Sequence, residues 1–387
     1  ESIQPKINMC LEAINNHLNG SYTELGKDIV HSAFYGCLEP DKLKDLHQYS
    51  SLTVDIETTG LKHYNSEIFS IAFAWDKHNG YAFDVEGQDL APLKEFFETY
   101  QGKLIFHNAS FDVTHLIYNL WMKGLYDPEG VLKGLEIMTR NLECTFIIAY
   151  LALNSCAEIE LGLKALAHEF TGDYAEDVKD ITALSKGTLL TYNLKDCLAT
   201  WFVKEKYEPI MLADDQKEVF DLYMLWMKDI IQMQLSGMPL NMERVKEVTA
   251  DVQTTADTYI QTLNNNPHIV KFTHALKEQW VEAKNQKLKK LRKTLDDAED
   301  VRFNPASGKQ LVELLYNQLG LPVLELTETK QPSTKGEVVA SLVHHTEDPL
   351  VKELLQTLVD FMQVEKILDA FTPAMNEAPY CKELDCH

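Results

Sequence analysis

Basic residues are scarce in this sequence of 387 residues. Its 36 lysines and arginines stand against 59 aspartates and glutamates, which gives a formal net charge of −23 at pH 7. This balance argues against nonspecific wrapping of nucleic acid, so a nucleic-acid substrate would need a local basic track or metal ions. Long apolar runs are also absent, and the start at Glu1 shows neither a signal nor a transit pattern, so we expect no membrane partner.

Closely spaced cysteine pairs are missing too. The seven cysteines are odd in number and scattered from Cys10 to Cys386, without a C-x-x-C motif. This usage favours a reduced, intracellular protein, and we expect a cytoplasmic one. A first residue other than methionine suggests a trimmed or partial chain.

The sequence has enough apolar material for sizeable cores. Hydrophobic residues make up 45% of the chain and aromatic residues 10%, and the length suggests two or three domains. Apolar residues at helical spacing predict a helix over 7–18, and a weaker pattern predicts a second helix over 24–35. We interpret residues 1–50 as a small helical module.

After this module the pattern changes to short strands. The predicted strands cover 52–57, 68–74, 81–83 and 103–106. The turn-forming segment 76–80 indicates that consecutive strands are antiparallel. A helix is predicted over 92–100, so strands and helices alternate. We therefore expect an α/β fold with a mixed sheet covered by helices.

Two carboxylates stand on the first of these strands. Between Leu52 and Leu61, apolar residues alternate with polar ones, so one face of the strand turns to the core and the other presents Asp55 and Glu57 together. Gly60 allows a sharp turn that leaves the acidic end at the rim of the sheet. This geometry suits a metal ion, but an edge strand with a solvated acidic tip has the same pattern.

Two further acidic positions lie on predicted helices. Asp112 falls in a first helical turn, where an acid commonly just stabilises the positive helix end; the same turn, with Asn108, could also face a phosphate or a terminal sugar. Tyr192 and Asp196 are four residues apart and share a helix face. They can address one ligand together or make an ordinary surface contact.

Taken together, these segments resemble a known family. They are Asp55–Leu61, His107–Asp112 and Tyr192–Thr200, with further similarity at Ala149–Leu151 and Leu161–Ala167. The chain resembles the proofreading 3′–5′ exonuclease domains of the DEDD superfamily with a tyrosine in the third motif, specifically those of family A DNA polymerases. One departure is Cys144, where relatives often carry Asp, but that position is not a metal ligand in the family. The resemblance implies a ribonuclease H-like exonuclease domain over 51–210.

The resemblance also implies a two-metal hydrolysis of phosphodiesters. The implied metal ligands are Asp55, Glu57, Asp112 and Asp196, which would hold two Mg²⁺ ions, with Mn²⁺ as a substitute. Asp55 would bridge both ions, Glu57 and Asp196 would complete one, and Asp112 would hold the other, partly through water. Tyr192, with Glu57, would position the attacking water. The implied substrate contacts are Leu61, His107, Asn108 and Phe111, with Leu61 wedged against the terminal base. The residue types fit independently, because hard cations prefer carboxylate oxygens.

The last part of the chain resembles the thumb of family A polymerases. The matching segments are Leu235–Leu240, Phe303–Leu311, Leu319–Pro322 and Ser333–Thr334. We assign residues 211–387 to this helical thumb region. Palm and fingers are absent, so we expect no polymerase activity from this chain alone; it is either the front of a longer polymerase or one subunit of a split enzyme.

Several helical features are predicted in this region. A long helix over 221–236 ends at Gly237, and another covers 349–371. Ser307-x-x-Gln310 and Thr334-x-x-Glu337 read as capping boxes. The apolar face of the first helix is predicted to contain Leu222, Leu225, Trp226, Ile230 and Met233.

One helical stretch of this region is strongly basic. It contains Lys284, Lys287, Lys289, Lys290, Arg292 and Lys293, which we call the basic strip. Four acidic residues follow between Asp296 and Asp300. The strip could be a solvated helix whose basic half folds against its acidic continuation. It could also track the backbone of duplex DNA, as a thumb tip would.

The sequence thus predicts a metal-dependent 3′–5′ DNA exonuclease joined to a polymerase thumb. The implied partners are a single-stranded 3′ end, a primer–template duplex, the palm and fingers of a polymerase and a processivity factor, in the cytoplasm of a bacterium or a phage-infected host. Two alternatives remain: a processive 3′–5′ ribonuclease of the same superfamily, and a noncatalytic DNA-holding subunit of a split polymerase.

Overall fold

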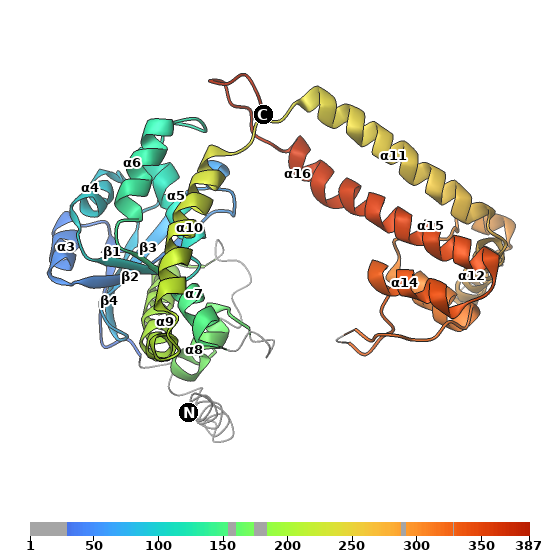
Figure 1. Ribbon diagram of the computed structural model, residues 1–387, viewed down its shortest axis with the longest axis horizontal. Helices are drawn as coiled ribbons and strands as arrows, with labels where there is room; N and C mark the ends of the chain where they lie inside the picture. The colour runs from blue at the N-terminus through green and yellow to red at the C-terminus, as the bar shows by residue number, and fades with distance from the viewer. Residues whose placement is uncertain (1–28, 154–159, 174–183, 288–291, 328) are drawn as a thin grey trace. The chain divides into compact units, whose positions relative to one another are not determined.

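Figure 1 shows the computed structural model, which describes residues 29–153, 160–173, 184–287, 292–327 and 329–387. The chain divides into two compact units, Glu1–Met238 and Pro239–His387, which we call the sheet unit and the helical unit and describe separately. In the part of the chain that is described, no helix is both long and apolar enough to span a membrane. The helix predicted over 7–18 lies outside the described residues.

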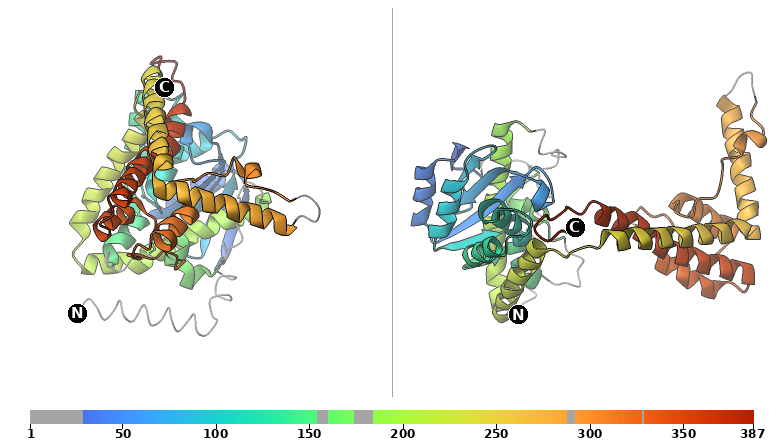
Figure 2. Two further views of the ribbon diagram at one scale, coloured as in Figure 1. Left: turned by 90° about the vertical axis from the view of Figure 1, so that its right-hand side faces the viewer. Right: turned by 90° about the horizontal axis from the view of Figure 1, so that it is seen from above.

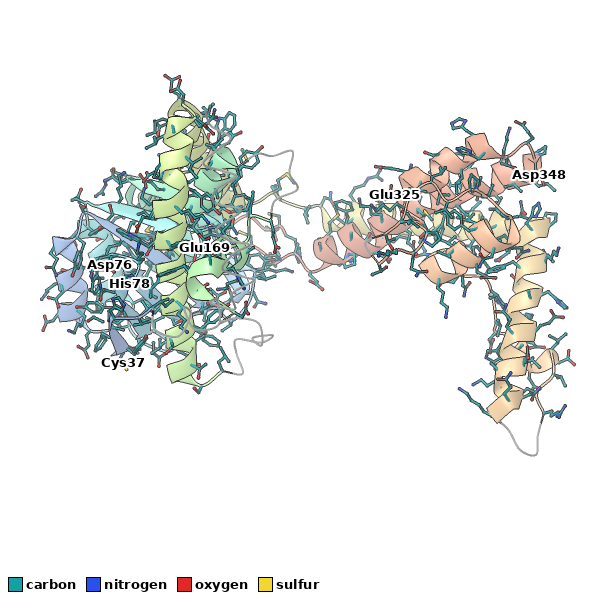
Figure 3. All side chains as sticks on the ribbon, turned by 90° about the horizontal axis from the view of Figure 1, so that it is seen from below. Cys37, Asp76, His78, Glu169, Glu325 and Asp348 are labelled. Atoms are coloured by element: carbon teal, nitrogen blue, oxygen red, sulfur yellow. The ribbon has the colours of Figure 1, made fainter. Side chains whose placement is uncertain are left out.

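A six-stranded mixed sheet forms the centre of the sheet unit, in the order β1-β4-β3-β2-β5-β6. The strands are β1 (Ser32–Cys37), β2 (Ser51–Thr58), β3 (Ile68–Ala74), β4 (Asn79–Asp84), β5 (Lys103–Phe106) and β6 (Leu142–Cys144). The predicted antiparallel run β2-β3-β4 is confirmed, and β1, β5 and β6 join in parallel. In the β3–β4 turn, Oδ1 of Asp76 accepts hydrogen bonds from the backbone N–H of His78 (2.7 Å) and of Asn79 (2.8 Å); Figure 3 labels Asp76 and His78.

Strand β1 corrects the helix predicted over 24–35. Residues 32–37 are extended and pair in parallel with β4, and Phe34 contacts Tyr81 and Phe83 through ring–ring packing. Pairing along the sheet edge therefore outweighs the weak helical periodicity. Strand β6 was not predicted, because three residues are too few to carry a periodic signal.

Helices cover both faces of this sheet (Figure 1). They are α3 (Pro40–Asp45), α4 (Ala91–Thr99), α5 (Ala109–Trp121), α6 (Pro128–Met138), α7 (Thr145–Ala152), α8 (Leu163–Thr171), α9 (Lys186–Ala213) and α10 (Lys217–Ser236), with 3₁₀ turns η1 (Leu46–Gln48) and η2 (His63–Asn65). The larger core joins Val54 and Phe73 on one sheet face to α4, α5, α6 and α10. The opposite face carries small residues such as Ala72, against which Leu194 of α9 packs. A Cβ atom at Gly80 would lie 2.6 Å from a methyl group of Leu194, so glycine allows α9 this close approach.

Helix α10 is formed as predicted, but its buried face is different. Phe220, Met227, Ile231 and Leu235 are buried against the sheet unit. The predicted apolar face, Leu222, Leu225, Trp226, Ile230 and Met233, is exposed. The helix is apolar on two sides, so periodicity alone could not decide which side packs. The helix therefore packs with the sheet unit, whereas the sequence interpretation placed residues 211–238 with the thumb region.

The helical unit is built around a second core. Its elements are α11 (Met242–Asn265), α12 (Pro267–Lys287), η5 (Asp296–Ala298), α13 (Gly308–Val312), the π-helical turn η6 (Glu313–Gln318), α14 (Gly336–Leu342), η7 (Val343–His345), α15 (Pro349–Lys366), the π-helical turn η8 (Ile367–Phe371) and α16 (Thr372–Asn376). Helices α11 and α15 run side by side, and the chain changes direction before α12 (Figure 2). Oγ of Ser307 accepts from the backbone N–H of Gln310, as its capping box predicts, whereas α14 begins at Gly336 without a side-chain cap, so the box at Thr334 is wrong.

Candidate functional site

Strand β2 and helix α9 bring the predicted acidic residues to one sheet face. Asp55 and Glu57 alternate with core residues of β2, so both belong to the face that α9 covers. Oγ1 of Thr53 donates a hydrogen bond to the backbone carbonyl of Cys197 (2.9 Å), which fixes the register of α9 on β2. Asp196, one residue earlier on α9, is therefore held beside the two strand carboxylates.

Three of the four predicted metal ligands converge closely. One carboxylate oxygen from each of Asp55, Glu57 and Asp196 lies within 4.8 Å of the others. Asp112, only 4% exposed, lies outside this group. Its Oδ1 accepts a hydrogen bond from the backbone N–H of Ile56, between the two strand acids (3.2 Å). Hard divalent cations take carboxylate oxygens, so this donor set fits such ions.

The electrostatics show that these carboxylates need positive charge. Burial raises the pKa of Asp55 to about 6, against the lowering effect of Lys164 and Asn193. Burial and then the charge of Asp55 raise the pKa of Glu57 to about 8. The pKa of Asp112 is raised well above its ordinary range by burial and then by Asp55. Glu57 and Asp112 therefore hold protons at neutral pH unless cations compensate their charge, whereas Asp55 is largely ionised there.

Lys164 supplies part of this charge, and the sequence did not single it out. Its ammonium group pairs with Asp196 and lies 4.5 Å from the centre of the Tyr192 ring. Burial lowers the pKa of Lys164 to about 8, although Asp55 and Glu57 act in the opposite direction. The only signal in the sequence was its position within the family-like segment Leu161–Ala167.

Tyr192 stands next to the same carboxylates. Burial, followed by the charges of Glu57 and Asp55, raises the pKa of its phenol to about 12. The hydroxyl therefore keeps its proton at neutral pH and can donate a hydrogen bond to a water molecule or an oxyanion. It cannot act as a general base there.

Asn193 is a second residue that sequence reasoning missed. It is fully buried, and its Nδ2 donates to Oδ2 of Asp55 (2.7 Å). Its Oδ1 accepts a hydrogen bond from Oγ of Ser70 on β3 (3.0 Å). Asn193 thus fixes the orientation of Asp55. A buried amide within the apolar face of α9 was the available signal, because such a group needs partners.

The predicted substrate contacts have different surroundings. Leu61 is 85% exposed on the loop after β2, and Asn108 is exposed at the start of α5 with a left-handed φ of 58°. Phe111 is half-buried. His107 uses both ring nitrogens within the protein: Nε2 donates to the carbonyl of Leu161 (3.1 Å), and Nδ1 lies 2.9 Å from Oγ1 of Thr145. His107 is therefore built into the wall of the site.

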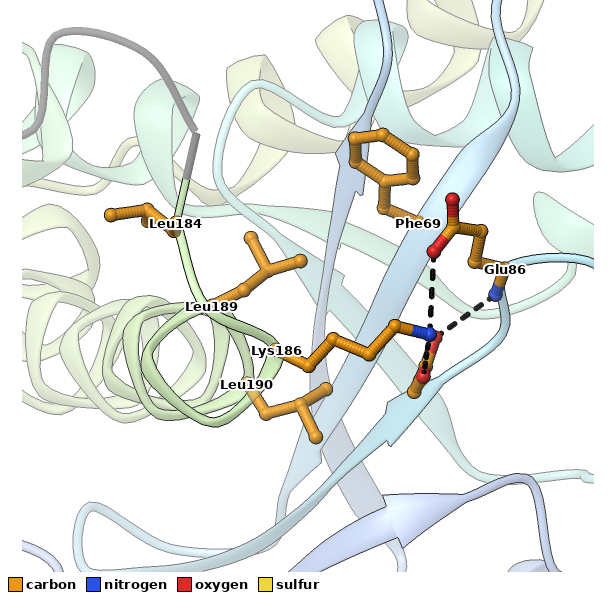
Figure 4. A pocket seen from close by; sticks show the side chains of 7 residues that line it. Phe69, Glu86, Leu184, Lys186, Leu189 and Leu190 are labelled. Atoms are coloured by element: carbon orange, nitrogen blue, oxygen red, sulfur yellow. Dashed lines mark hydrogen bonds and ion pairs between the residues drawn. The ribbon is translucent and has the colours of Figure 1, made fainter. Parts of the chain in front are cut away.

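A second hollow of the sheet unit lies away from these acids. It has a volume of about 180 Å³ and contains Lys186, whose Nζ lies 2.5 Å from Asp84 and 3.3 Å from Glu86 (Figure 4). The lysine pairs with both carboxylates, and Leu189 and Leu190 line the other side.

The basic strip is only partly helical. Lys284 and Lys287 lie on α12, Lys289 and Lys290 lie outside the described residues, and Arg292 and Lys293 follow after the helix. The prediction of one continuous helix is therefore wrong at its end, where Asn285 holds the backbone of Lys293 by two hydrogen bonds. Lys293 pairs with Asp297 (2.9 Å). Lys284, Lys287 and Arg292 form no ion pair with any described residue.

Comparison with known proteins identifies the sheet unit. Residues 39–200 match a family model described as 3′-5′ exonuclease. The DNA polymerase of Escherichia phage T5 is 24% identical over 343 residues, which is 81% of this chain and 36% of that protein. DNA polymerase I of Pseudomonas aeruginosa is 34% identical over 92 residues, which is 24% of this chain and 10% of that protein.

A solved structure gives the same picture of the fold. The POL domain of Pol1 from M. smegmatis, in complex with DNA primer-template and dNTP, has a TM-score of 0.53 and 15% identity. The match covers 91% of this chain and 52% of that one. The predicted resemblance is confirmed: residues 39–200 match the 3′–5′ exonuclease family, and the relatives that match this chain are DNA polymerases. The matched segments span only about a third of the T5 polymerase and a tenth of the Pseudomonas enzyme.

Proposed function

We propose that this protein removes nucleotides from a frayed 3′ end of DNA, as the proofreading and thumb portion of a family A DNA polymerase. The observation that carries this proposal is the convergence of Asp55, Glu57 and Asp196 beside buried Asp112, within the segment that matches the exonuclease family. Hydrolysis of a phosphodiester requires an activated water, charge compensation at phosphorus and a stabilised leaving 3′ oxygen.

Divalent cations are the cofactors of this reaction, and we propose Mg²⁺, with Mn²⁺ as a substitute. Bound ions would activate the water and compensate the charge that develops on the phosphate oxygens. Asp55, Glu57 and Asp196 would hold one ion, and Asp55 and Asp112 would hold the other. Asn193 keeps Asp55 in a single orientation through its hydrogen bond to Oδ2.

The groups around the carboxylates have separate tasks. Tyr192 keeps its proton, donates a hydrogen bond to the attacking water and orients that water together with Glu57; its raised pKa supports this donor role. Lys164 balances the acids before ions and substrate arrive, because it pairs with Asp196. Leu61 and Phe111 contact the terminal nucleotide, and Asn108 faces its phosphate or sugar at the helix start.

The helical unit holds the DNA in this proposal. Its α12 side carries Lys284, Lys287 and Arg292, which form no ion pair with described residues. A hollow of about 450 Å³ whose lining includes Lys277 and Arg302 adds further positive groups to the same helix and its neighbours. Basic groups of this kind bind backbone phosphates without reading sequence. We propose that the palm and fingers belong to the same longer protein or to a second subunit, and that a processivity factor can join them.

The cellular setting follows from the relatives and the cysteines. Cys37, Cys144, Cys197, Cys381 and Cys386 are free thiols. The relatives include polymerases of a phage and of a bacterium. We therefore place the protein in the cytoplasm of a bacterium or a phage-infected cell.

One experiment tests the proposed function. A single-stranded DNA oligonucleotide, labelled at its 3′ end in one sample and at its 5′ end in another, is incubated with the chain in Mg²⁺. We expect early release of the 3′ label as mononucleotide and stepwise shortening of the 5′-labelled strand. Release from the 5′ end, or faster cleavage of an RNA of the same sequence, would contradict the proposal. Equal, slow release by wild type and by Asp55→Ala with Glu57→Ala would leave only a DNA-holding role.

A further inference from the structure

The loop after β2 presents Leu61 to solvent, and hydrogen bonds within the loop fix its local shape. Oγ1 of Thr58 donates to the carbonyl of Gly60 (2.8 Å), and the backbone N–H of Thr59 donates to the carbonyl of Glu67 (3.0 Å). These bonds close the loop at its base. They do not determine how the loop leans toward α5, where Phe111 lies.

His63 supplies that connection. It is half-buried in the turn η2, two residues after Leu61. Its ring centre lies 5.1 Å from that of Tyr118 and 6.2 Å from that of His115, at interplanar angles of 65° and 90°. Both partners belong to α5, and edge-to-face contacts of this kind prefer a defined geometry.

His115 extends the connection to Phe111. It is only 2% exposed, and its ring centre lies 4.3 Å from that of Phe111. Its Nδ1 donates a hydrogen bond to the carbonyl of Phe111 (2.9 Å), one helical turn earlier. The rings of His63, His115 and Phe111 therefore form a continuous chain from the Leu61 loop to the start of α5.

Both histidines are neutral rings at physiological pH. Burial, and then the proximity of His115, lowers the pKa of His63 to about 4. Burial also lowers the pKa of His115, while the carbonyl groups of Phe111 and Gly60 oppose this lowering. The chain of rings thus makes apolar contacts without charge repulsion, and the carbonyl of Gly60 faces His115 from the loop.

We propose that His63 and His115 are positioning residues that hold Leu61 and Phe111 in the relative arrangement needed to grip the terminal base. This inference rests on the proposed function, in which Leu61 and Phe111 contact the terminal nucleotide. The histidines touch neither the carboxylates nor the reacting phosphate in this scheme. They act on substrate binding and leave the hydrolytic step unchanged.

The test is steady-state hydrolysis of a 3′-labelled single strand by the full chain in saturating Mg²⁺. We expect His63→Ala to raise KM about tenfold while kcat stays within about twofold, because the loop loses its ring contacts to α5. His63→Phe keeps an aromatic ring at the same place, so KM should return to within about twofold of wild type. His115→Phe also keeps an aromatic ring, so its KM should likewise stay within about twofold of wild type.

His47→Ala is the matched control. His47 also lies on a short 3₁₀ turn of the sheet unit and packs edge-on against Phe96 and Tyr100, with ring centres 5.2 and 5.9 Å away, but no predicted site residue is part of that cluster. The KM of His47→Ala should equal that of wild type.

Three results would overturn the inference while an active wild type upholds the proposed function. They are an unchanged KM in His63→Ala, an equal rise of KM in His47→Ala, and a fall in kcat of His63→Ala at constant KM. An inactive wild type would remove the proposed function and this inference with it.

Discussion

The two units of this protein handle charge in opposite ways. In the sheet unit, carboxylates from β2, α5 and α9 are brought close together, in surroundings that raise the pKa values of the β2 and α5 acids. In the helical unit, Lys284, Lys287 and Arg292 form no ion pair with described residues on an otherwise acidic chain. Converging buried charge costs stability and suits chemistry, whereas dispersed exposed charge costs little and suits binding to phosphates. The proposed division of labour between catalysis and DNA holding rests on this difference.

The largest effect should come from removing the strand acids. Asp55→Ala with Glu57→Ala should lower the rate of release of 3′ nucleotides by about a thousandfold, because metal binding and water positioning fail together. The measurement is single-turnover hydrolysis of a short single strand. Affinity for duplex DNA, measured in Ca²⁺, should stay within about twofold of wild type, since we propose that the helical unit binds the duplex. A variant that loses both hydrolysis and duplex binding would contradict the assignment of these two tasks to different units.

A smaller loss should follow from Asn193→Ala. Without the amide, Asp55 loses the hydrogen bond from Nδ2 and Ser70 loses its acceptor, so kcat should fall by about thirtyfold, as for other residues that orient metal ligands. Asn285→Ala is the matched control in the helical unit, because Asn285 also makes two hydrogen bonds. It should leave hydrolysis of a short single strand unchanged. Equal losses in both variants would point to general destabilisation.

The helical unit is tested by neutralising three basic residues that form no ion pair with described residues. Lys284→Gln, Lys287→Gln and Arg292→Gln together should weaken binding to a primer–template duplex by about tenfold at moderate salt, and lower the slope of log Kd against log salt by about one for each lost phosphate contact. Fluorescence anisotropy over a salt series measures both quantities. A control triple of Lys330, Lys366 and Lys382 changed to Gln alters the same net charge elsewhere in the unit. If both triples weaken binding equally, the effect is one of net charge and the strip is not a binding surface.

The smallest effect concerns stability and pH. Asp55, Glu57 and Asp112 have pKa values in the folded protein above those of an unfolded chain, so these acids bind more protons in the folded state up to about pH 8. His63, His107 and His115 have lowered pKa values and act in the opposite direction below about pH 6.5. The acids therefore dominate from about pH 6.5 to about pH 8. Without divalent ions, unfolding stability of the sheet unit should therefore fall as pH rises through this range. Excess Mg²⁺ should raise the melting temperature by about 3–6 °C at pH 8 and by less at pH 5.5, because ions bind the ionised acids.

Calorimetry in chelator and in Mg²⁺ measures this difference. Asp55→Asn with Glu57→Gln should flatten the pH dependence and abolish the shift caused by Mg²⁺. The helical unit should show no such shift. A shift of equal size in both units would indicate nonspecific ion binding.

Sequence reasoning predicted the elements in which residues of one kind repeat at a regular spacing. Alternation along β2 placed Asp55 and Glu57 on one face, and a spacing of four placed Tyr192 and Asp196 on one face of α9. Contacts between segments that are distant in the sequence leave no regular spacing. Lys164 and Asn193 were therefore missed, although they contact the predicted acids. Short elements such as β6, and the choice between the two apolar sides of α10, depend on what packs against them. Sequence reasoning therefore singled out carboxylates that the structure brings together, and the structure shows further residues that contact them.

The central claim is that distant segments of the chain build one site for a pair of divalent cations. Anomalous diffraction from a crystal soaked in Mn²⁺ with a short single-stranded DNA tests it most directly. We predict two ions about 3.5–4 Å apart, both bound by Asp55, one also by Glu57 and Asp196, with the 3′ end of the strand above them. Ions bound elsewhere, or a bound strand whose 5′ end lies over these carboxylates, would contradict the account.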